Sequence, residues 1–440
     1  MPATAVTTRS YKISFTTGVS IVVANMVGTG VFTSLGFQAV ELKSGFALLM
    51  LWVVGGLVAL CGALSYGELA AALPRSGGEY HYLSRIYHPA LGFLSGWVSA
   101  TVGFAAPVAL AAMALGRYAQ SVWPALEPRV LSVGVVLALT AVHGLSRQTG
   151  SRLQVAVTAI KVLVLVVFIG AGFIIASPQP VSFLPVAPAW RELLSPAFAV
   201  SLVYVSYAYS GWNAAVYLAG EVDRPQRNLP RILLIGTAAV LLLYVGLNFV
   251  FLYSTPLSML EGQVEVGFVA ATQLFGPAVG RLMGGVVAVL LVSTVSSMIF
   301  AGPRIIQVMG EDLPALRWLA RKSPADIPVR ALLFQTALTL LFILTSTFEE
   351  VLLYAGFILS LFTLLSVLGL FVLRRQQPHL PRPYRTWGYP VTPLLFLALN
   401  AWTLWFIVHD KPTETLYGLA TLAVGLVVYR LSRRPATLQS

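Results

Sequence analysis

Long apolar runs recur along the whole chain, and this pattern limits its fold more than any other feature. Most of the runs approach the length of about 20 residues that a helix needs to cross the hydrocarbon core of a bilayer. No interval between them has the size of a separate soluble domain. We therefore predict an all-α membrane protein with twelve transmembrane helices, at residues 13–37, 44–72, 90–119, 130–144, 151–176, 196–220, 231–255, 277–307, 328–347, 350–373, 391–408 and 415–430.

Charged residues are scarce and unevenly placed. They make up 10% of the chain, against about 25% in soluble domains. The net charge of +12 is a property that nucleic-acid-binding proteins share. However, 21 of the 28 lysine and arginine residues fall in segments on the same predicted side of the membrane as the N-terminus. Because such a bias marks the cytoplasmic side, we expect a multi-pass cell-membrane protein with both termini in the cytoplasm, surrounded by the lipid bilayer and without a nucleic-acid partner.

The spacing of the predicted helices indicates an internal repeat. The first five helices and the next five begin at corresponding intervals, offset by roughly 180 to 200 residues. Five crossings is an odd number, so the second copy must enter the membrane from the opposite side, as in the inverted repeats of many secondary transporters. The predicted parts are a cytoplasmic tail 1–12, a first repeat 13–176, an external connection 177–195, a second repeat 196–373, a cytoplasmic loop 374–390, two final helices 391–430 and a tail 431–440.

A glycine-containing segment interrupts the first helix of each repeat. They are Val27–Val31 and Tyr209–Asn213. Glycine lowers helix stability by about 1 kcal/mol relative to alanine, although small residues also allow close packing of membrane helices. Their matching positions in the two halves are the best sequence sign of a transporter binding site.

An unwound pair of this kind offers two sorts of backbone group. The N–H groups at the start of the outer half of the first helix suit a carboxylate. The carbonyls near Val27 in the first break, and near Tyr207, Ala208 and Ser210 in the second, suit an ammonium group. A ligand that carries both charges one carbon apart is an α-amino acid, whose side chain this argument does not identify.

Several motifs resemble one family. These are residues 25–32, residues 207–213 with Glu221 and 225–230, the run 74–80, and the pair 382–384 and 388–390. They are similar to the amino acid–polyamine–organocation superfamily, and to its L-type amino acid transporter branch. The resemblance implies the leucine-transporter fold, a 5+5 inverted repeat with broken first and sixth helices and two additional C-terminal helices. It also implies a carboxylate site at Gly28, Thr29 and Gly30, an amine site at the carbonyls of the two breaks, including Ser210 and Gly211, and an aromatic gate at Tyr207.

Two residues depart from the commonest family pattern. Thr29 stands where serine is usual, and Tyr207 stands where phenylalanine is frequent. Neither change removes a backbone group. The tyrosine leaves open how tightly the gate closes and how polar the pocket is.

Lys161 is the one lysine in the middle of a predicted span. A charge at that depth costs about 2.5 to 3.5 kcal/mol on insertion scales, so it marks a functional site unless the side chain reaches an interface. We expect its partners to be carbonyls of the first break and hydroxyls of the helix 277–307, where four such residues cluster: Ser293, Thr294, Ser296 and Ser297. By resemblance, the lysine stands where sodium-coupled relatives hold a cation, and Tyr244 is either a functional neighbour or a packing residue.

The predicted function is sodium-independent transport of amino acids by alternating access. The substrate is a neutral L-amino acid, moved by exchange, uniport or proton symport, because Lys161 is the only fixed charge expected at mid-membrane. A cationic amino acid or polyamine antiporter is the alternative, and a non-transporting receptor is the alternative of another class. The five histidines show no metal-ligand spacing, so we expect no catalytic residue, metal or cofactor.

The single cysteine, Cys61, lies within the predicted span 44–72. Animal relatives of the L-type branch form a disulfide to an ancillary subunit from a cysteine between the third and fourth helices. The corresponding segment here, 120–129, contains no cysteine. We therefore expect no disulfide-linked heavy chain.

Overall fold

The structure is a computed structural model, and it describes residues 12–145, 151–175, 177–312, 316–323 and 327–432. Across these ranges the regular structure is helical, apart from one isolated backbone bridge between Ile13 and Val222. Ten helical segments are long and apolar enough to cross a membrane. Two further predicted spans differ, because 328–347 forms a helix of 17 residues and 196–220 is broken into two pieces. The predicted all-α membrane fold is confirmed.

The first half of the chain begins with a broken helix. The third predicted span is also irregular, because a turn of π-helix, η1, separates α5 from α6. The elements are α1 (Phe15–Met26), α2 (Gly30–Glu41), α3 (Gly45–Ala72), α4 (Gly78–Ile86), α5 (Pro89–Val98), η1 (Ser99–Gly103), α6 (Ala105–Val122), α7 (Pro128–Leu145) and α8 (Ser151–Ile175).

The second half of the chain also begins with a broken helix. Its elements are α9 (Ala187–Leu193), α10 (Pro196–Tyr209), η2 (Ala214–Glu221), α11 (Pro225–Ser254), α12 (Leu257–Leu260), α13 (Val266–Phe275), α14 (Pro277–Asp312), α15 (Val329–Thr345), α16 (Phe348–Gln376), α17 (Val391–Asp410) and α18 (Pro412–Ser432). The short helices α4, α9, α12 and α13 occupy segments for which the sequence predicted no span.

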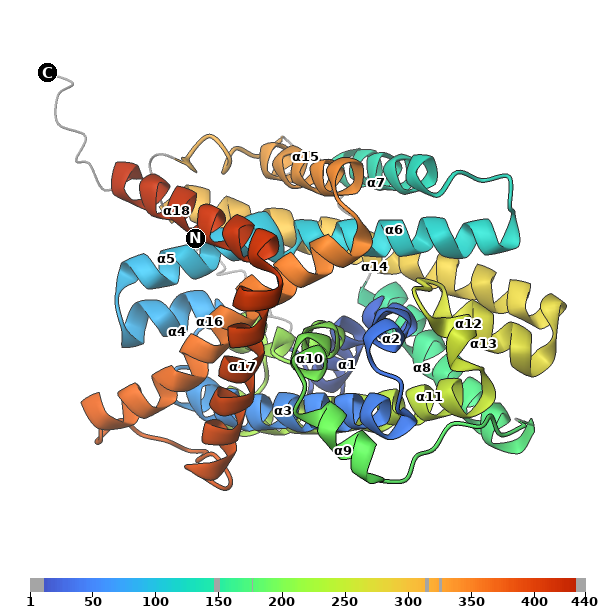
Figure 1. The fold of residues 1–440 in the computed structure, drawn as a ribbon. Coiled ribbons are helices and arrows are strands. Elements are labelled where there is room, and N and C mark those ends of the chain that lie inside the picture. Colours follow the sequence, from blue (N-terminus) through green and yellow to red (C-terminus); the bar gives the residue numbers. More distant parts are fainter. Residues whose placement is uncertain (1–11, 146–150, 176, 313–315, 324–326, 433–440) are drawn as a thin grey trace, which may run out of the picture.

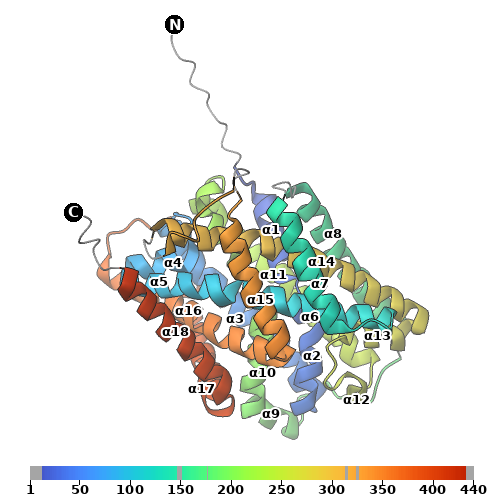
Figure 2. The same ribbon diagram turned by 90° about the horizontal axis from the view of Figure 1, so that it is seen from above.

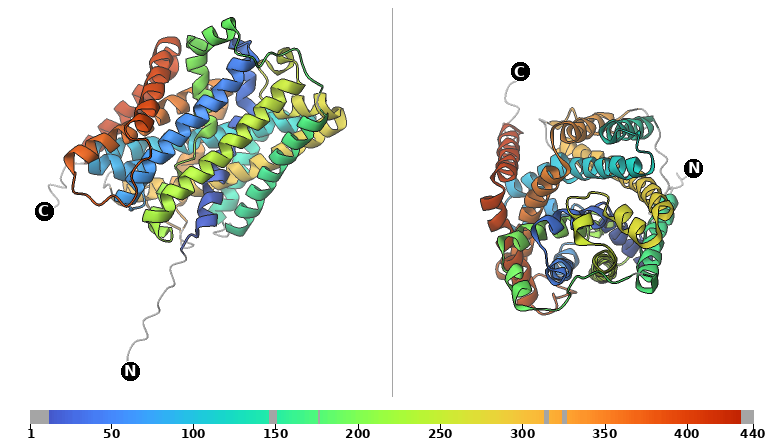
Figure 3. Two further views of the ribbon diagram at one scale, coloured as in Figure 1. Left: turned by 90° about the horizontal axis from the view of Figure 1, so that it is seen from below. Right: turned by 45° about the vertical axis from the view of Figure 1, so that its right-hand side comes forward.

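The broken helices lie in the middle of the bundle. Figure 1 shows α1, α2 and α10 between α3 on one side and α6 with α14 on the other. In Figure 2, α9 and α12 lie at the lower end of the molecule, whereas α4 and α1 lie toward the upper end. We call these two ends the α9 end and the α4 end. Figure 3 shows that α1 begins and α18 ends at the α4 end.

Small residues allow the central helices to approach one another closely. A Cβ atom on Gly18 of α1 would lie 2.4 Å from the Ile232 side chain of α11. A Cβ atom on Gly55 of α3 would lie 2.3 Å from the Val205 side chain of α10. Larger residues would separate these helices, so the positions of the breaks depend on this packing.

Candidate functional site

The first break lies between α1 and α2. Helix α1 ends at Met26, and α2 begins at Gly30 after Val27, Gly28 and Thr29. The amide of Gly28 bonds to the carbonyl of Met26 at 2.7 Å and so leaves the α-helical pattern. The first N–H groups of α2 have no acceptor within their own helix. Together with the positive end of the helix dipole, they form a favourable place for an anionic group.

The second break follows α10. Ser210 is extended, with a ψ angle of 152°, and Gly211 has a φ angle of +94°. A side chain at Gly211 would be strained, and its Cβ atom would lie 2.9 Å from the Asn25 carbonyl of α1. Beyond this turn the chain continues as the 3-10 helix η2. The interruption therefore extends further along the second broken helix than the sequence pattern suggested.

The two breaks lie against each other. A Cβ atom on Gly30 would lie 2.5 Å from Cα of Ala208, so the start of α2 touches the backbone of α10. Gly28 differs, because a Cβ atom there would meet only the Met26 carbonyl oxygen, at 3.9 Å. Tyr207 is buried beside the Thr29 side chain. Space for an added side-chain atom is therefore found at Gly28 and not at Gly30.

Tyr244 of α11 joins the two breaks. Its hydroxyl lies 2.5 Å from the Met26 carbonyl oxygen and 3.2 Å from the Ala208 carbonyl oxygen. The ring is fully buried, with the ring of Trp52 at 5.7 Å and that of Tyr209 at 5.0 Å. Because one phenol serves carbonyls of both breaks, it holds their relative position.

Lys161 of α8 reaches the first break from the other side. Its ammonium group donates to Thr294 Oγ1 at 2.7 Å and to the Val27 carbonyl at 3.4 Å, and the residue is 5% exposed. A cavity of about 10 Å³ beside it is lined by Gly28 and Phe32, among others. Such a space holds at most one water molecule.

The hydroxyl cluster of α14 divides between different partners. Thr294 contacts the lysine, whereas Ser296 Oγ pairs with His143 Nε2 of α7 at 2.8 Å. Ser297 donates to the Ser293 carbonyl of its own helix at 2.7 Å. The structure therefore brings Lys161, Val27 and Thr294 together, and it places Ser293 and Ser296 outside this contact.

The two breaks combine N–H donors at α2 with carbonyl acceptors at α1 and α10. Within the described ranges, no group of three or more histidine, cysteine or acidic residues is arranged to hold a metal ion. The polar groups at the breaks include backbone N–H and carbonyl groups, the ammonium group of Lys161, and the hydroxyls of Thr29, Tyr207, Tyr244 and Thr294.

Comparison of the sequence with protein families matches residues 13–429 to the family described as amino acid permease. The chain belongs to the amino acid permease family. It is 30% identical to the large neutral amino acids transporter small subunit 2 of Mus musculus and of Homo sapiens, over 96% of this chain and 80% of each relative. It is 26% identical to the b(0,+)-type amino acid transporter 1 of Mus musculus, over 96% of this chain and 87% of the relative. It is 28% identical to the Asc-type amino acid transporter 1 of Mus musculus, over 96% of this chain and 81% of the relative.

These relatives are transporters, and the expectation that the permease is not an enzyme is confirmed. Its predicted membership of the L-type branch of transporters is likewise confirmed. Two further polar clusters lie at the α4 end, around buried carboxylates to which the sequence pattern assigned no role.

A buried carboxylate, Glu79 of α4, joins three elements at the α4 end. It accepts hydrogen bonds from Tyr66 of α3 at 3.0 Å, from Asn213 at 2.5 Å and from Tyr217 of η2. Glu79 is 4% exposed. The motifs 74–80 and 207–213 are therefore in direct contact, although 134 residues separate Glu79 from Asn213. Their juxtaposition was not predictable from either motif alone.

A second buried carboxylate, Glu68 of α3, lies at the same end. Arg374 of α16 donates two hydrogen bonds to it, at 2.8 and 2.6 Å. The amide of Thr386 adds a third at 2.7 Å, and Arg382 Nε lies 3.4 Å away. Glu68 is fully buried. The motif that contains Arg382 therefore anchors the segment after α16 to α3.

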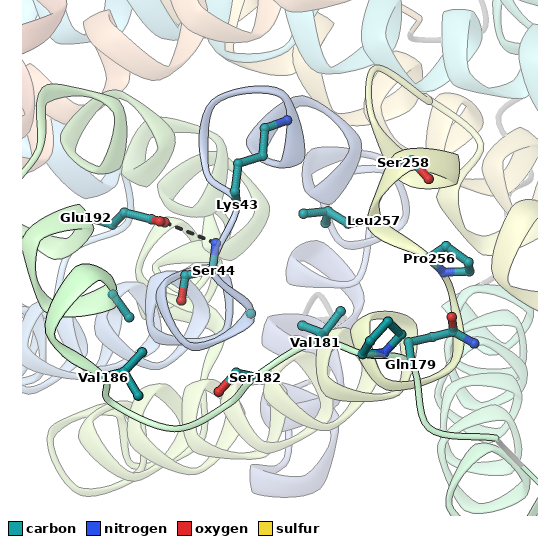
Figure 4. A pocket seen from close by; sticks show the side chains of 13 residues that line it. Lys43, Ser44, Gln179, Val181, Ser182, Val186, Glu192, Pro256, Leu257 and Ser258 are labelled. Carbon is teal, nitrogen blue, oxygen red and sulfur yellow. Dashed lines mark hydrogen bonds between the residues drawn. The ribbon is translucent and has the colours of Figure 1, made fainter.

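A separate groove of about 550 Å³ opens at the α9 end. Figure 4 shows Glu192 of α9 accepting a hydrogen bond from the Ser44 amide, with Lys43 and Gln179 at its rim. No residue of either break lines this groove. It is therefore distinct from the site between the breaks.

Proposed function

We propose that this permease moves amino acids across the membrane without sodium. The contact of Lys161 with the Val27 carbonyl and Thr294 Oγ1 carries the proposal. A carbonyl and a hydroxyl are ligands that a hard cation would take, and here an ammonium group occupies them. A fixed positive charge at this point supports the first break without a bound metal ion.

The substrate site lies between the breaks in this proposal. The carboxylate of an amino acid binds at Gly28, Thr29 and Gly30, where the start of α2 favours negative charge. Its bond to the Gly28 amide replaces the bond from that amide to the Met26 carbonyl. Its ammonium group binds carbonyls of Val27 and of the second break, at Ala208, Ser210 and Gly211. Tyr207 closes over the substrate as an aromatic gate. The contact between Gly30 and Ala208 supports this placement, because it brings the start of α2 beside the backbone of α10.

A neutral amino acid is the favoured substrate. The acidic residue that reaches the second break is Glu79, and its oxygens already accept three hydrogen bonds. Cationic amino acids or polyamines are the second candidate. They would need Glu79 to release Asn213 and bind a second positive charge.

The α4 end faces the cytoplasm in this proposal, with both termini on that side of the cell membrane. The excess of lysine and arginine in the segments assigned to that side supports it. We also infer that no partner is linked by a disulfide, because the single cysteine, Cys61, is buried in α3.

The test is uptake of labelled leucine into proteoliposomes in sodium and in choline medium. We expect equal rates in both media and competition by neutral amino acids. Dependence on sodium would contradict the role of Lys161, and competition by arginine or agmatine alone would contradict the neutral assignment. Saturable binding without any accumulation inside the vesicles would identify a receptor.

Two hydroxyl variants sharpen the test of the lysine. We expect Lys161→Ala to slow uptake by more than about tenfold, which corresponds to about 1.4 kcal/mol. Thr294→Val should also slow uptake, because it removes the 2.7 Å contact. Ser296→Ala is the matched control on the same helix, since its hydroxyl faces His143. Full activity of both Lys161→Ala and Thr294→Val would refute the proposal.

A further inference from the structure

Three aromatic rings from three different helices form a single stack near the α9 end. Phe37 of α2 lies in the middle, 5.8 Å from Tyr204 of α10 and 5.7 Å from Phe348 of α16. The interplanar angles are 5° and 4°, so the three rings are parallel. We call Phe37, Tyr204 and Phe348 the aromatic stack.

The aromatic stack lies just beyond the breaks. Phe37 follows Gly30 by seven residues and Tyr204 precedes Ala208 by four. At 1.5 Å per residue these intervals correspond to about 10 and 6 Å along the two helices. Gly30 and Ala208 touch. The stack therefore lies on the α9 side of this contact between α2 and α10.

Polar groups fix two of the rings in position. The Tyr204 hydroxyl donates to Glu349 Oε1 at 2.5 Å, and Glu349 is the residue after Phe348. Thr347 caps α16 by a reciprocal pair of hydrogen bonds with Glu350, which orders the first turn. Tyr204 of α10 and the first turn of α16, both of which contact Phe37, are therefore also joined to each other by a hydrogen bond.

We propose that the aromatic stack is the outer gate of this permease, closed in this structure, and that Glu349 is its positioning residue. The proposal rests on the proposed function, because a gate requires a substrate that passes. Helices α2 and α10 carry the proposed substrate site, and both meet α16 through the stack. An amino acid leaves toward the α9 end when α2 and α10 move away from α16. That movement separates Phe37 from Phe348 and breaks the bond between Tyr204 and Glu349.

Two rings of the stack carry no polar group, and the third, Tyr204, is buried but directs its hydroxyl to Glu349. Phe37 and Phe348 are hydrocarbon rings, and Glu349 has a side chain that is 39% exposed, so water can replace the Tyr204 hydroxyl. This composition suits a contact that must form and break in every transport cycle.

A reversible cross-link tests the gate. In a Cys61→Ala background, Phe37→Cys and Phe348→Cys are combined, and labelled leucine uptake is measured before and after a short bifunctional thiosulfonate. We expect uptake to fall by more than about tenfold and to return after reduction. The matched control is Phe249→Cys with Tyr253→Cys, a stacked pair within α11 at 5.5 Å, whose cross-link cannot join two helices. Uptake that continues through complete cross-linking of the first pair overturns the proposal.

A second measurement does not depend on cysteines. Phe37→Ala should raise the one-way efflux of preloaded amino acid relative to exchange by about threefold or more, because the gate no longer closes fully. Phe249→Ala should leave that ratio unchanged. An unchanged ratio in Phe37→Ala also overturns the proposal. Absence of transport by the unmodified protein would instead contradict the proposed function itself, so the two failures are distinguishable.

Discussion

The two ends of the bundle are closed by different chemistry. At the α4 end, Glu68 and Glu79 are buried and collect hydrogen bonds from α3, α16, η2 and the segment after α16. At the α9 end, the aromatic stack joins α2, α10 and α16 through ring faces. The first closure is directional and desolvated, whereas the second is apolar and partly accessible.

This difference predicts how each end opens. A buried carboxylate that loses its donors remains unpaired in a medium of low dielectric constant, which is costly. Stacked rings separate without that penalty, and each pair contributes about 0.5 to 1.5 kcal/mol beyond its buried area. We therefore expect the α9 end to open at the rings and the polar contacts of the α4 end to move as units. The backbone bonds from Ile13 to Glu221 and from Asp223 to Ile13 likewise tie the start of α1 to the end of η2.

The largest expected effect is the loss of stability when a buried carboxylate at the α4 end is removed. Glu68→Ala leaves Arg374 and Arg382 without their buried partner, and removing one member of such a pair costs about 3 to 5 kcal/mol. Glu349→Ala removes an ion pair with Lys411, whose side chains are 39% and 35% exposed, and the hydrogen bond from Tyr204. An exposed ion pair contributes less than about 1 kcal/mol, and water can replace the hydrogen bond at the exposed carboxylate, so the loss should be smaller than for Glu68→Ala. Thermal stability in detergent measures both variants, and similar losses of stability would contradict the contrast between the two ends.

The second effect concerns the region between the two ends. Gly30→Ala places a Cβ atom 2.5 Å from the Ala208 backbone, and overpacking of this kind costs about 1 to 3 kcal/mol. It should separate α2 from α10 and abolish uptake. Gly28→Ala should leave stability unchanged and raise KM, because its Cβ atom enters the proposed substrate space. Uptake kinetics and melting temperature distinguish the two variants, and equal stability losses would argue against the contact at Gly30.

A pair of hydroxyl deletions sharpens the comparison further. Tyr217→Phe removes one of the three donors to buried Glu79, and a hydrogen bond to a charged group contributes about 1.5 kcal/mol or more. Tyr204→Phe removes the donor to the half-exposed Glu349, where water can substitute. We expect the first variant to lower the melting temperature more than the second. The reverse order would mean that the polar closure lies at the α9 end.

The smallest expected effect is a dependence of the melting temperature on pH that arises from His81 of α4. Burial lowers the pKa of His81 from 6.5, and the nearby Arg75 and Arg85 lower it further. The neutral ring is thus favoured in the folded state, so its stabilisation is present above pH 6.5 and is lost as the pH falls through the lowered pKa. Melting temperatures at pH 7.5 and 5.5 should differ less in His81→Gln than in the unmodified protein. An identical difference in both proteins would exclude His81 as the cause.

Sequence patterns located the membrane helices and both breaks because hydropathy and glycine spacing are local signals. The first break was expected at Val27–Val31, and α1 ends at Met26 with α2 beginning at Gly30. The predicted span 328–347 matches α15 to within two residues, whereas the 3-10 form of η2 depends on tertiary packing, which hydropathy does not report. The four short helices were too brief or too polar to resemble spans.

The site was only partly predictable for the same reason. Lys161 was conspicuous as a charge within an apolar run, but four hydroxyl residues within five positions of α14 could not be ranked without knowing which face meets α8. Glu79 and Asn213 belong to the motifs 74–80 and 207–213, and no local periodicity indicates that these two motifs are in contact. Phe37 and Phe348 are ordinary phenylalanines of an apolar chain until the fold places them face to face.

The contact between Gly30 and Ala208 also limits how the protein can tolerate change. The atoms nearest to a Cβ atom on Gly30 include Cα and N of Ala208, at 2.5 and 3.2 Å. Even a glycine at position 208 would keep both atoms. A side chain gained at position 30 therefore has no compensating substitution at its neighbour, and only a displacement of the whole helix α10 could restore function.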